Sequence, residues 1–140
     1  MKKLTMADYP LAETRGDQIT GKRGMALQDI TLEAVLAGKV TMADLQITPK
    51  ALQDQSEIAS DAGRPTLAMN FSRAAELVEV PQDVIMSTYE LLRPGRARKK
   101  QELLDSAAVF RDQYRAVTIA DFIVEAAEVY EKRGLFARRF

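Results

Sequence analysis

From residue 48 onward, apolar residues recur at helical spacing within segments that proline and glycine delimit. Thr48 followed by Pro49 is typical of a helix start, and Gly63 is typical of a helix end. Further segments begin at Pro65 and after Pro81. The 140 residues contain no apolar–polar alternation long enough for a useful strand. These features predict an all-α fold.

The expected fold is an open three-helix up-and-down bundle over residues 48–140, with extra short helices. Residues 1–47 precede it as an irregular N-terminal arm. Thr118 with Asp121 three residues later resembles a capping box and predicts that a new helix begins there. That helix is expected to bury Phe122 and Ile123. In chain order, the expected helical segments are 31–38, 41–45, 48–62, 65–79, 82–92, 99–117 and 118–134.

The composition excludes several kinds of chemistry. The chain has no cysteine and no histidine. It therefore has no disulfide, no thiol nucleophile, no histidine base and none of the usual zinc sites. Twenty basic and twenty acidic residues cancel, so no strong net field attracts nucleic acid or a membrane. No apolar run approaches the ~20 residues of a membrane span, and we expect a soluble cytoplasmic protein.

The sequence GDQITGKR, residues 16–23, comes close to a phosphate-binding loop. Its last position is Arg23, where the magnesium-binding hydroxyl would stand. The flanking segments also lack the strand and the helix that such a loop requires. A glycine-rich turn is the better interpretation. We find no catalytic, cofactor-binding or metal-binding residues in the sequence.

The stretch TYELLRPGRARKK, residues 88–100, concentrates five basic residues around a Pro–Gly turn. Three interpretations are open: nucleic-acid binding, docking to a protein, and a solvated loop. Residues 65–92 could form a helix-turn-helix. However, the segment 82–92 has only Gln82, near its start, to contact base edges. A small helical nucleic-acid-binding or adaptor protein is therefore the alternative reading.

Several blocks together resemble the small, or gamma, subunit of the adenosylcobalamin-dependent diol and glycerol dehydratases. The longest block, MNFSRAAELVEVPQDVIMSTYELLRPGRA, spans residues 69–97. The resemblance extends from residue 8 to about 133, so it covers nearly the whole chain. The other blocks are DYPLA (8–12), TGK (20–22), DITLEAVLAGKV (29–40), ITPKALQDQSEIASDAGR (47–64), ELL (102–104) and DFIVEAAEVY (121–130).

The resemblance implies a structural role within a larger enzyme. The small subunit would pack on a large TIM-barrel subunit, in a dimer of heterotrimers that also contains a medium subunit. Adenosylcobalamin would be bound by the other subunits and would carry the radical conversion of 1,2-diols or glycerol to aldehydes. The location would be the cytoplasm or a bacterial microcompartment. The residues expected at or near the contact with the large subunit are Tyr9, Pro10, Leu32, Arg73, Arg93 and Arg96.

Overall fold

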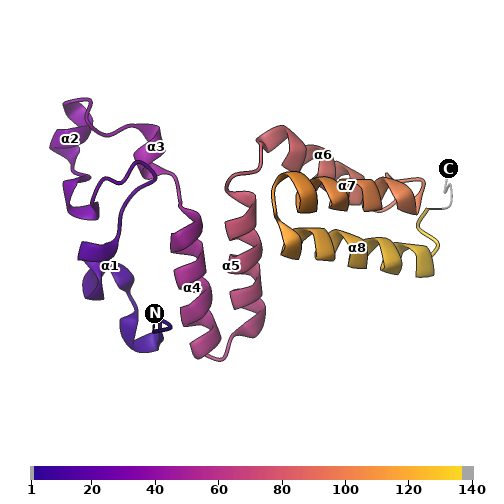
Figure 1. Cartoon of the computed structure of the whole chain (residues 1–140), viewed down its shortest axis with the longest axis horizontal. Coiled ribbons are helices and arrows are strands. Elements are labelled where there is room, and N and C mark those ends of the chain that lie inside the picture. The colour runs from indigo at the N-terminus through magenta and orange to yellow at the C-terminus, as the bar shows by residue number, and fades with distance from the viewer. Residues whose placement is uncertain (1, 137–140) are drawn as a thin grey trace. The chain divides into compact units, whose positions relative to one another are not determined.

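The computed structural model of the chain describes residues 2–136, and the described part is all-α, as predicted (Figure 1). Within it the only β-type pairing is an isolated bridge between Thr20 and Ala26. Contacts divide the chain into an N-terminal unit, Met1–Val78, and a C-terminal unit, Glu79–Phe140. The residues expected to form one bundle, 48–140, are thus shared between two compact units. The expected domain boundary between residues 47 and 48 stays a prediction.

The N-terminal unit is built on a helical hairpin of α4 (Pro49–Asp61) and α5 (Pro65–Leu77) (Figure 1). The Thr48 hydroxyl accepts a hydrogen bond from the Ala51 N–H at 3.1 Å, which confirms the predicted cap. Gly63 has a φ of +72°, and the Arg64 N–H after it donates to the Ala59 carbonyl. This bonding turns the chain sharply and directs α5 back along α4.

The inward faces of α4 and α5 are mainly apolar, and Ser56 is the one buried polar residue of the two helices. Ser56 is buried, and its hydroxyl donates to the Ala68 carbonyl at 2.7 Å and contacts the Ser72 hydroxyl at 2.9 Å. These bonds join the two helices and satisfy a polar group that would otherwise be costly to bury. The buried apolar residues of this hairpin are Leu52, Ile58, Ala59, Ala68 and Ala75.

Residues 2–48 contain only short elements. Two of them, α2 (Leu32–Leu36) and α3 (Met42–Leu45), match the predicted short helices. Helices of this length are marginal by themselves, so tertiary contacts must hold them. The remaining short elements are η1 (Met6–Asp8), α1 (Leu11–Thr14), η2 (Gly16–Gln18) and η3 (Leu27–Asp29).

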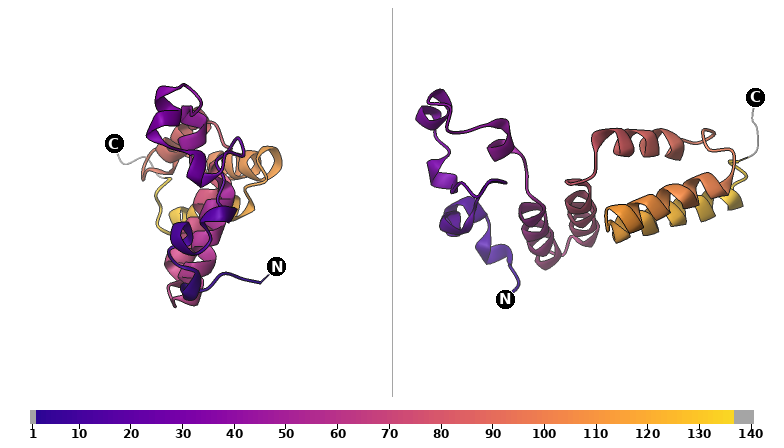
Figure 2. Two further views of the ribbon diagram at one scale, coloured as in Figure 1. Left: turned by 90° about the vertical axis from the view of Figure 1, so that its left-hand side faces the viewer. Right: turned by 45° about the horizontal axis from the view of Figure 1, so that its top comes forward.

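The C-terminal unit contains α6 (Gln82–Leu92), α7 (Lys100–Gln113) and α8 (Val117–Lys132). The last two pack side by side as a second hairpin (Figure 2). Its largest fully buried side chains are Phe110, Leu103 and Ile123. Helix α6 buries none of its residues. Hydrogen bonds attach it to this hairpin, from the Tyr130 hydroxyl to the Leu92 carbonyl and between the Thr88 and Ser106 hydroxyls.

Two predictions about α8 were wrong. The helix begins at Val117 with Ala116 as its N-cap, so Thr118 lies inside the helix rather than at its cap. The Ala116 N–H donates to the Phe110 carbonyl, which fixes the start of α8 by the end of α7. Phe122 is exposed, whereas Ile123 is buried as expected. The buried stripe of α8 consists mainly of small residues: Ala116, Ala120, Ile123 and Ala127.

Candidate subunit interface

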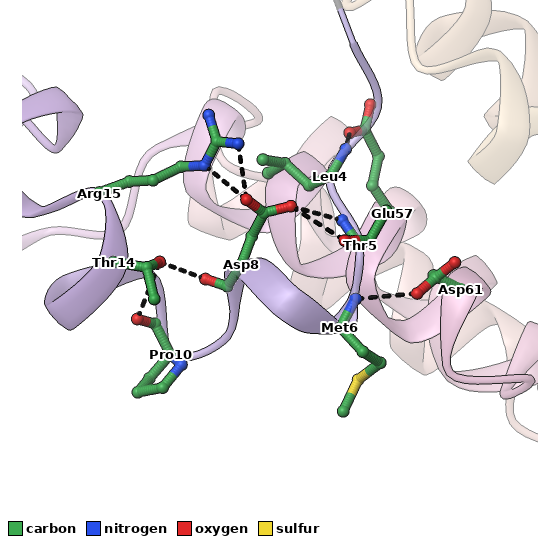
Figure 3. Close-up of polar contacts among 9 residues, drawn as sticks. All are labelled: Leu4, Thr5, Met6, Asp8, Pro10, Thr14, Arg15, Glu57 and Asp61. Carbon is green, nitrogen blue, oxygen red and sulfur yellow. Dashed lines mark hydrogen bonds and ion pairs between the residues drawn. The ribbon is translucent and has the colours of Figure 1, made fainter.

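Tyr9 and Pro10 lie in the turn between η1 and α1, and both are exposed. The turn is braced from within by Thr14, whose hydroxyl donates to the Asp8 carbonyl at 2.5 Å (Figure 3). The Asp8 carboxylate also pairs with the Arg15 guanidinium at 2.6 Å. The Tyr9 ring is thus presented to solvent by a turn with fixed internal contacts.

The segment before Tyr9 is fastened to α4 by two carboxylates one helical turn apart (Figure 3). Glu57 accepts the Leu4 N–H and Asp61 accepts the Met6 N–H, each at 2.8 Å. The pKa of Asp8 is lowered from its ordinary value, first by the Thr5 N–H and then by Arg15. The N–H groups of Leu4, Thr5 and Met6 are thus satisfied by side-chain carboxylates.

Leu32 is the first residue of α2, and its side chain is 70% exposed. The Thr31 hydroxyl caps the helix by accepting the Ala34 N–H at 3.1 Å. The cap sets the direction of the first turn, so Leu32 is held outward by local bonding.

An ion pair in the arm between a half-exposed arginine and a buried aspartate was missed by the sequence analysis. The Arg23 guanidinium binds the Asp44 carboxylate through two donors, and its Nη2 also donates to the Lys39 carbonyl at 3.0 Å. Asp44 is almost fully buried and accepts the Thr41 N–H at 2.8 Å. Arg23, followed by Thr41, lowers the pKa of Asp44 to about 2. The arginine that argued against a phosphate loop thus anchors α3.

Arg73 lies in the middle of α5 and is half-buried. Arg93 and Arg96 lie in the turn that follows α6, where the Arg96 N–H donates to the Arg93 carbonyl at 3.1 Å. The guanidinium of Arg93 pairs with Glu90 at 3.1 Å, and both side chains are about half exposed. Exposed pairs of this kind are weak, so the Arg93 guanidinium can exchange partners at small cost.

In the rest of the basic stretch, Lys100 is engaged through its side chain, and Arg98 and Lys99 through their backbone N–H groups. Lys100 pairs with Glu128 at 3.0 Å and with Glu131 at 3.2 Å. Its pKa is raised, first by Glu128 and then by Glu131. The Glu102 carboxylate accepts the N–H groups of Lys99 and Arg98, which lower its pKa. These carboxylates offset the cations near the N-terminus of α7.

The predicted interface residues come from several parts of both units. Tyr9 with Pro10, Leu32 and Arg73 belong to three different elements of the N-terminal unit. Arg93 and Arg96 share one turn of the C-terminal unit. The assignment of these six residues to an interface stays a prediction.

Exposed apolar side chains form the strongest functional signal that the sequence analysis missed. They concentrate on α2 and α3 and in the residues just after them. The spacing of Leu32, Val35 and Leu36 could have indicated them in the sequence, because it places three large apolar residues on one face of a helix too short to form a core. The others in this region are Met42, Leu45 and Ile47.

The described residues offer little for catalysis. No group of three or more His, Cys, Asp or Glu side chains among them could hold a metal ion. Within residues 2–136, none of the helices combines the length and apolar character that a bilayer span needs. A hollow of about 540 Å³ lies beside α4 and α5 and is lined by Ser56, Ser60, Ser72 and neighbouring residues. The described residues thus form an all-α chain with exposed apolar surface.

Comparison with known proteins shows the family of this chain. Residues 4–137 match the dehydratase small subunit family. The propanediol dehydratase small subunit of Citrobacter freundii is 47% identical over 128 residues, which cover 91% of this chain and 74% of that protein. The corresponding subunit of Salmonella typhimurium is 47% identical over 132 residues, 94% of this chain and 76% of that protein. The chain belongs to the dehydratase small-subunit family, as the sequence motifs indicated.

Proposed function

We propose that this chain is the non-catalytic small subunit of an adenosylcobalamin-dependent dehydratase that converts 1,2-propanediol or glycerol to an aldehyde. The observation that carries the proposal is the family match across residues 4–137, together with 47% identity to propanediol dehydratase small subunits. The chain's role is to cover apolar surface of its partners and to support the assembled enzyme.

The partners are a large TIM-barrel subunit and a medium subunit, in a dimer of heterotrimers. When bound, adenosylcobalamin supplies the radical chemistry. The residues of this chain do not fit that cofactor. Two hollows beside α4, of about 140 and 540 Å³, are of a size that suits ligands smaller than a corrin. The proposal assigns the cofactor to the other subunits and places the enzyme in the cytoplasm or a bacterial microcompartment.

The contact with the large subunit involves Tyr9, Pro10, Leu32, Arg73, Arg93 and Arg96. The exposure of Tyr9 and Leu32 supports this assignment, because both are large apolar side chains without cover in the isolated chain. Arginine and tyrosine are enriched at protein interfaces. Engagement of Arg93 and Lys100 with carboxylates of the same unit weighs against the nucleic-acid alternative, as does the family match.

The test is co-purification of the tagged chain with the products of its neighbouring genes, followed by an assay of diol-to-aldehyde conversion with and without adenosylcobalamin. We expect a stable complex whose activity depends on the cofactor, and a comparison of 1,2-propanediol with glycerol then identifies the substrate. A chain that purifies alone, without activity, would refute the proposal. If Arg93→Ala and Arg96→Ala both leave assembly and activity intact, these two arginines are not interface residues.

A further inference from the structure

The most exposed large apolar side chains of the described residues lie on two short helices at one end of the N-terminal unit (Figure 1). Leu36 is 79% exposed and Met42 is 74% exposed. Leu32 and Leu36 are one turn apart on α2, while Met42 and Leu45 are one turn apart on α3. We define the α2–α3 surface as Leu32, Val35, Leu36, Met42, Leu45 and Ile47.

The α2–α3 surface is poor in charge. Across residues 32–47 the charged side chains are Glu33, Lys39 and Asp44. Asp44 is buried and neutralised by Arg23, which leaves Glu33 and Lys39 at the rim. Depletion of charge at the centre with enrichment of Met and large apolar residues distinguishes the core of a protein interface from ordinary surface. A solvated loop of this length would normally carry more polar residues.

The α2–α3 surface is also held in place from behind. Arg23 binds Asp44 of α3 and the Lys39 carbonyl of the connection between the helices. The Lys39 N–H in turn donates to the Ala34 carbonyl at the end of α2. Gly21 lies against α3 so closely that a Cβ there would be 3.0 Å from the Asp44 carbonyl oxygen. A surface fixed before binding loses less entropy when a partner covers it.

The exposed area of the chain is larger than that of two separate compact globules. The accessible surface is 9754 Å² for a mass of 15.6 kDa. Two separate compact globules, each of half this mass, would together expose about 8,700 Å². The excess of roughly 1,000 Å² is comparable to the ~800 Å² that each partner buries in a standard protein–protein interface.

We propose that the α2–α3 surface is the apolar contact through which this chain binds the large subunit of its dehydratase, in a weakly charged apolar hollow of that subunit. The proposal rests on the proposed function, since family membership supplies the partner. It adds to the six predicted residues the five that the sequence analysis did not select, namely Val35, Leu36, Met42, Leu45 and Ile47. A second copy of this chain is the alternative partner for the α2–α3 surface.

The experiment measures binding of the purified chain to the remaining dehydratase subunits, assembled without it, by titration on a biosensor. The test variants are Leu36→Asp and Met42→Asp. We expect each to weaken binding at least tenfold, because a carboxylate would replace an apolar side chain in a dry contact. Both side chains are more than 70% exposed, so helicity and melting temperature of the isolated variants should match the unmodified chain.

The matched control is Val117→Asp, which makes a similar change at a side chain 47% exposed in the C-terminal unit. Asp is favourable in the first turn of α8, and we expect unchanged binding. Failure of the unmodified chain to bind would refute the proposed function and this inference together. Normal binding by Leu36→Asp and Met42→Asp, or equal loss in Val117→Asp, would refute the inference alone. So would self-association of the isolated chain that Leu36→Asp abolishes while subunit binding persists.

Discussion

Replacing Phe110 with alanine should remove the largest side chain from the centre of the C-terminal unit. The Phe110 side chain is 1% exposed, and its ring lies 6.3 Å from the Tyr114 ring between centroids. A fully buried Phe→Ala change costs about 3–5 kcal/mol, through lost transfer energy and the cavity left behind. For a unit of this size, 1 kcal/mol corresponds to a shift of roughly 4–8 °C in melting temperature. Phe110→Ala should therefore lower the melting temperature of the C-terminal unit by more than about 12 °C.

Phe122→Ala is the matched control, because the same change is made on the same hairpin at a side chain 41% exposed. The lost apolar burial of about 1–2 kcal/mol is partly offset by the better helix propensity of alanine. We expect a net cost of about 1 kcal/mol or less. Urea and thermal unfolding of both variants, followed by circular dichroism, provide the comparison. Equal losses, or a larger loss in Phe122→Ala, would show that the packing assigned to α7 and α8 is wrong.

Three further predictions concern the backbone, a hydrogen bond and pH. Gly63→Ala should destabilise the chain by about 1 kcal/mol, because φ is +72° there, although the space around Gly63 is open. The control is Gly16→Ala, in open space without a positive φ, which should be neutral or stabilising by up to about 1 kcal/mol. Similar shifts in melting temperature for the two variants would contradict this prediction. Tyr130→Phe removes the donor to the Leu92 carbonyl and should cost about 1 kcal/mol in urea unfolding, with faster hydrogen exchange in α6. The pKa of Asp44 falls from 3.8 to about 2 on folding, so its contribution to stability is complete above pH 3.8 and is lost as pH falls toward 2. The urea midpoint of the unmodified chain should fall between pH 4 and pH 2, and Asp44→Asn should make this fall smaller. An equal fall in the variant would refute the stabilising role of the Asp44 carboxylate.

Helix boundaries set by local bonding were predictable from the sequence. Thr48 accepts the Ala51 N–H, and Gly63 adopts a left-handed φ, just as their residue types indicate. The same holds for Thr31 at the start of α2. In each case the partner lies within a few residues, so no knowledge of the tertiary fold is needed.

The start of α8 was not predicted, because it depends on how α7 ends, at an arginine in the left-handed conformation that usually favours glycine. Arg115 before it has a φ of 54°, and the Ala116 N–H bonds back to Phe110 on the preceding helix. Phe122 was placed in the core because large apolar side chains were given the most weight. Ala120 and Ala127 are instead fully buried. Small residues allow two helices to approach closely, so a stripe of alanines can mark an interior face as well as a stripe of leucines.

The candidate interface was only partly accessible from sequence for a related reason. Pattern analysis assumes that a chain buries its apolar residues in its own core. In a subunit, some apolar residues serve a core and others serve a partner, and both produce the same spacing. Leu52 and Leu36 are each part of a helical apolar pattern, yet the first is 8% exposed and the second 79%. The difference lies in tertiary packing: Leu52 packs in the α4–α5 hairpin, whereas α2 and α3 lie in the arm, where the Arg23–Asp44 pair joins residues 21 positions apart. Because such pairing is not visible in apolar spacing, the spacing alone does not say which apolar faces a small subunit buries in its own core.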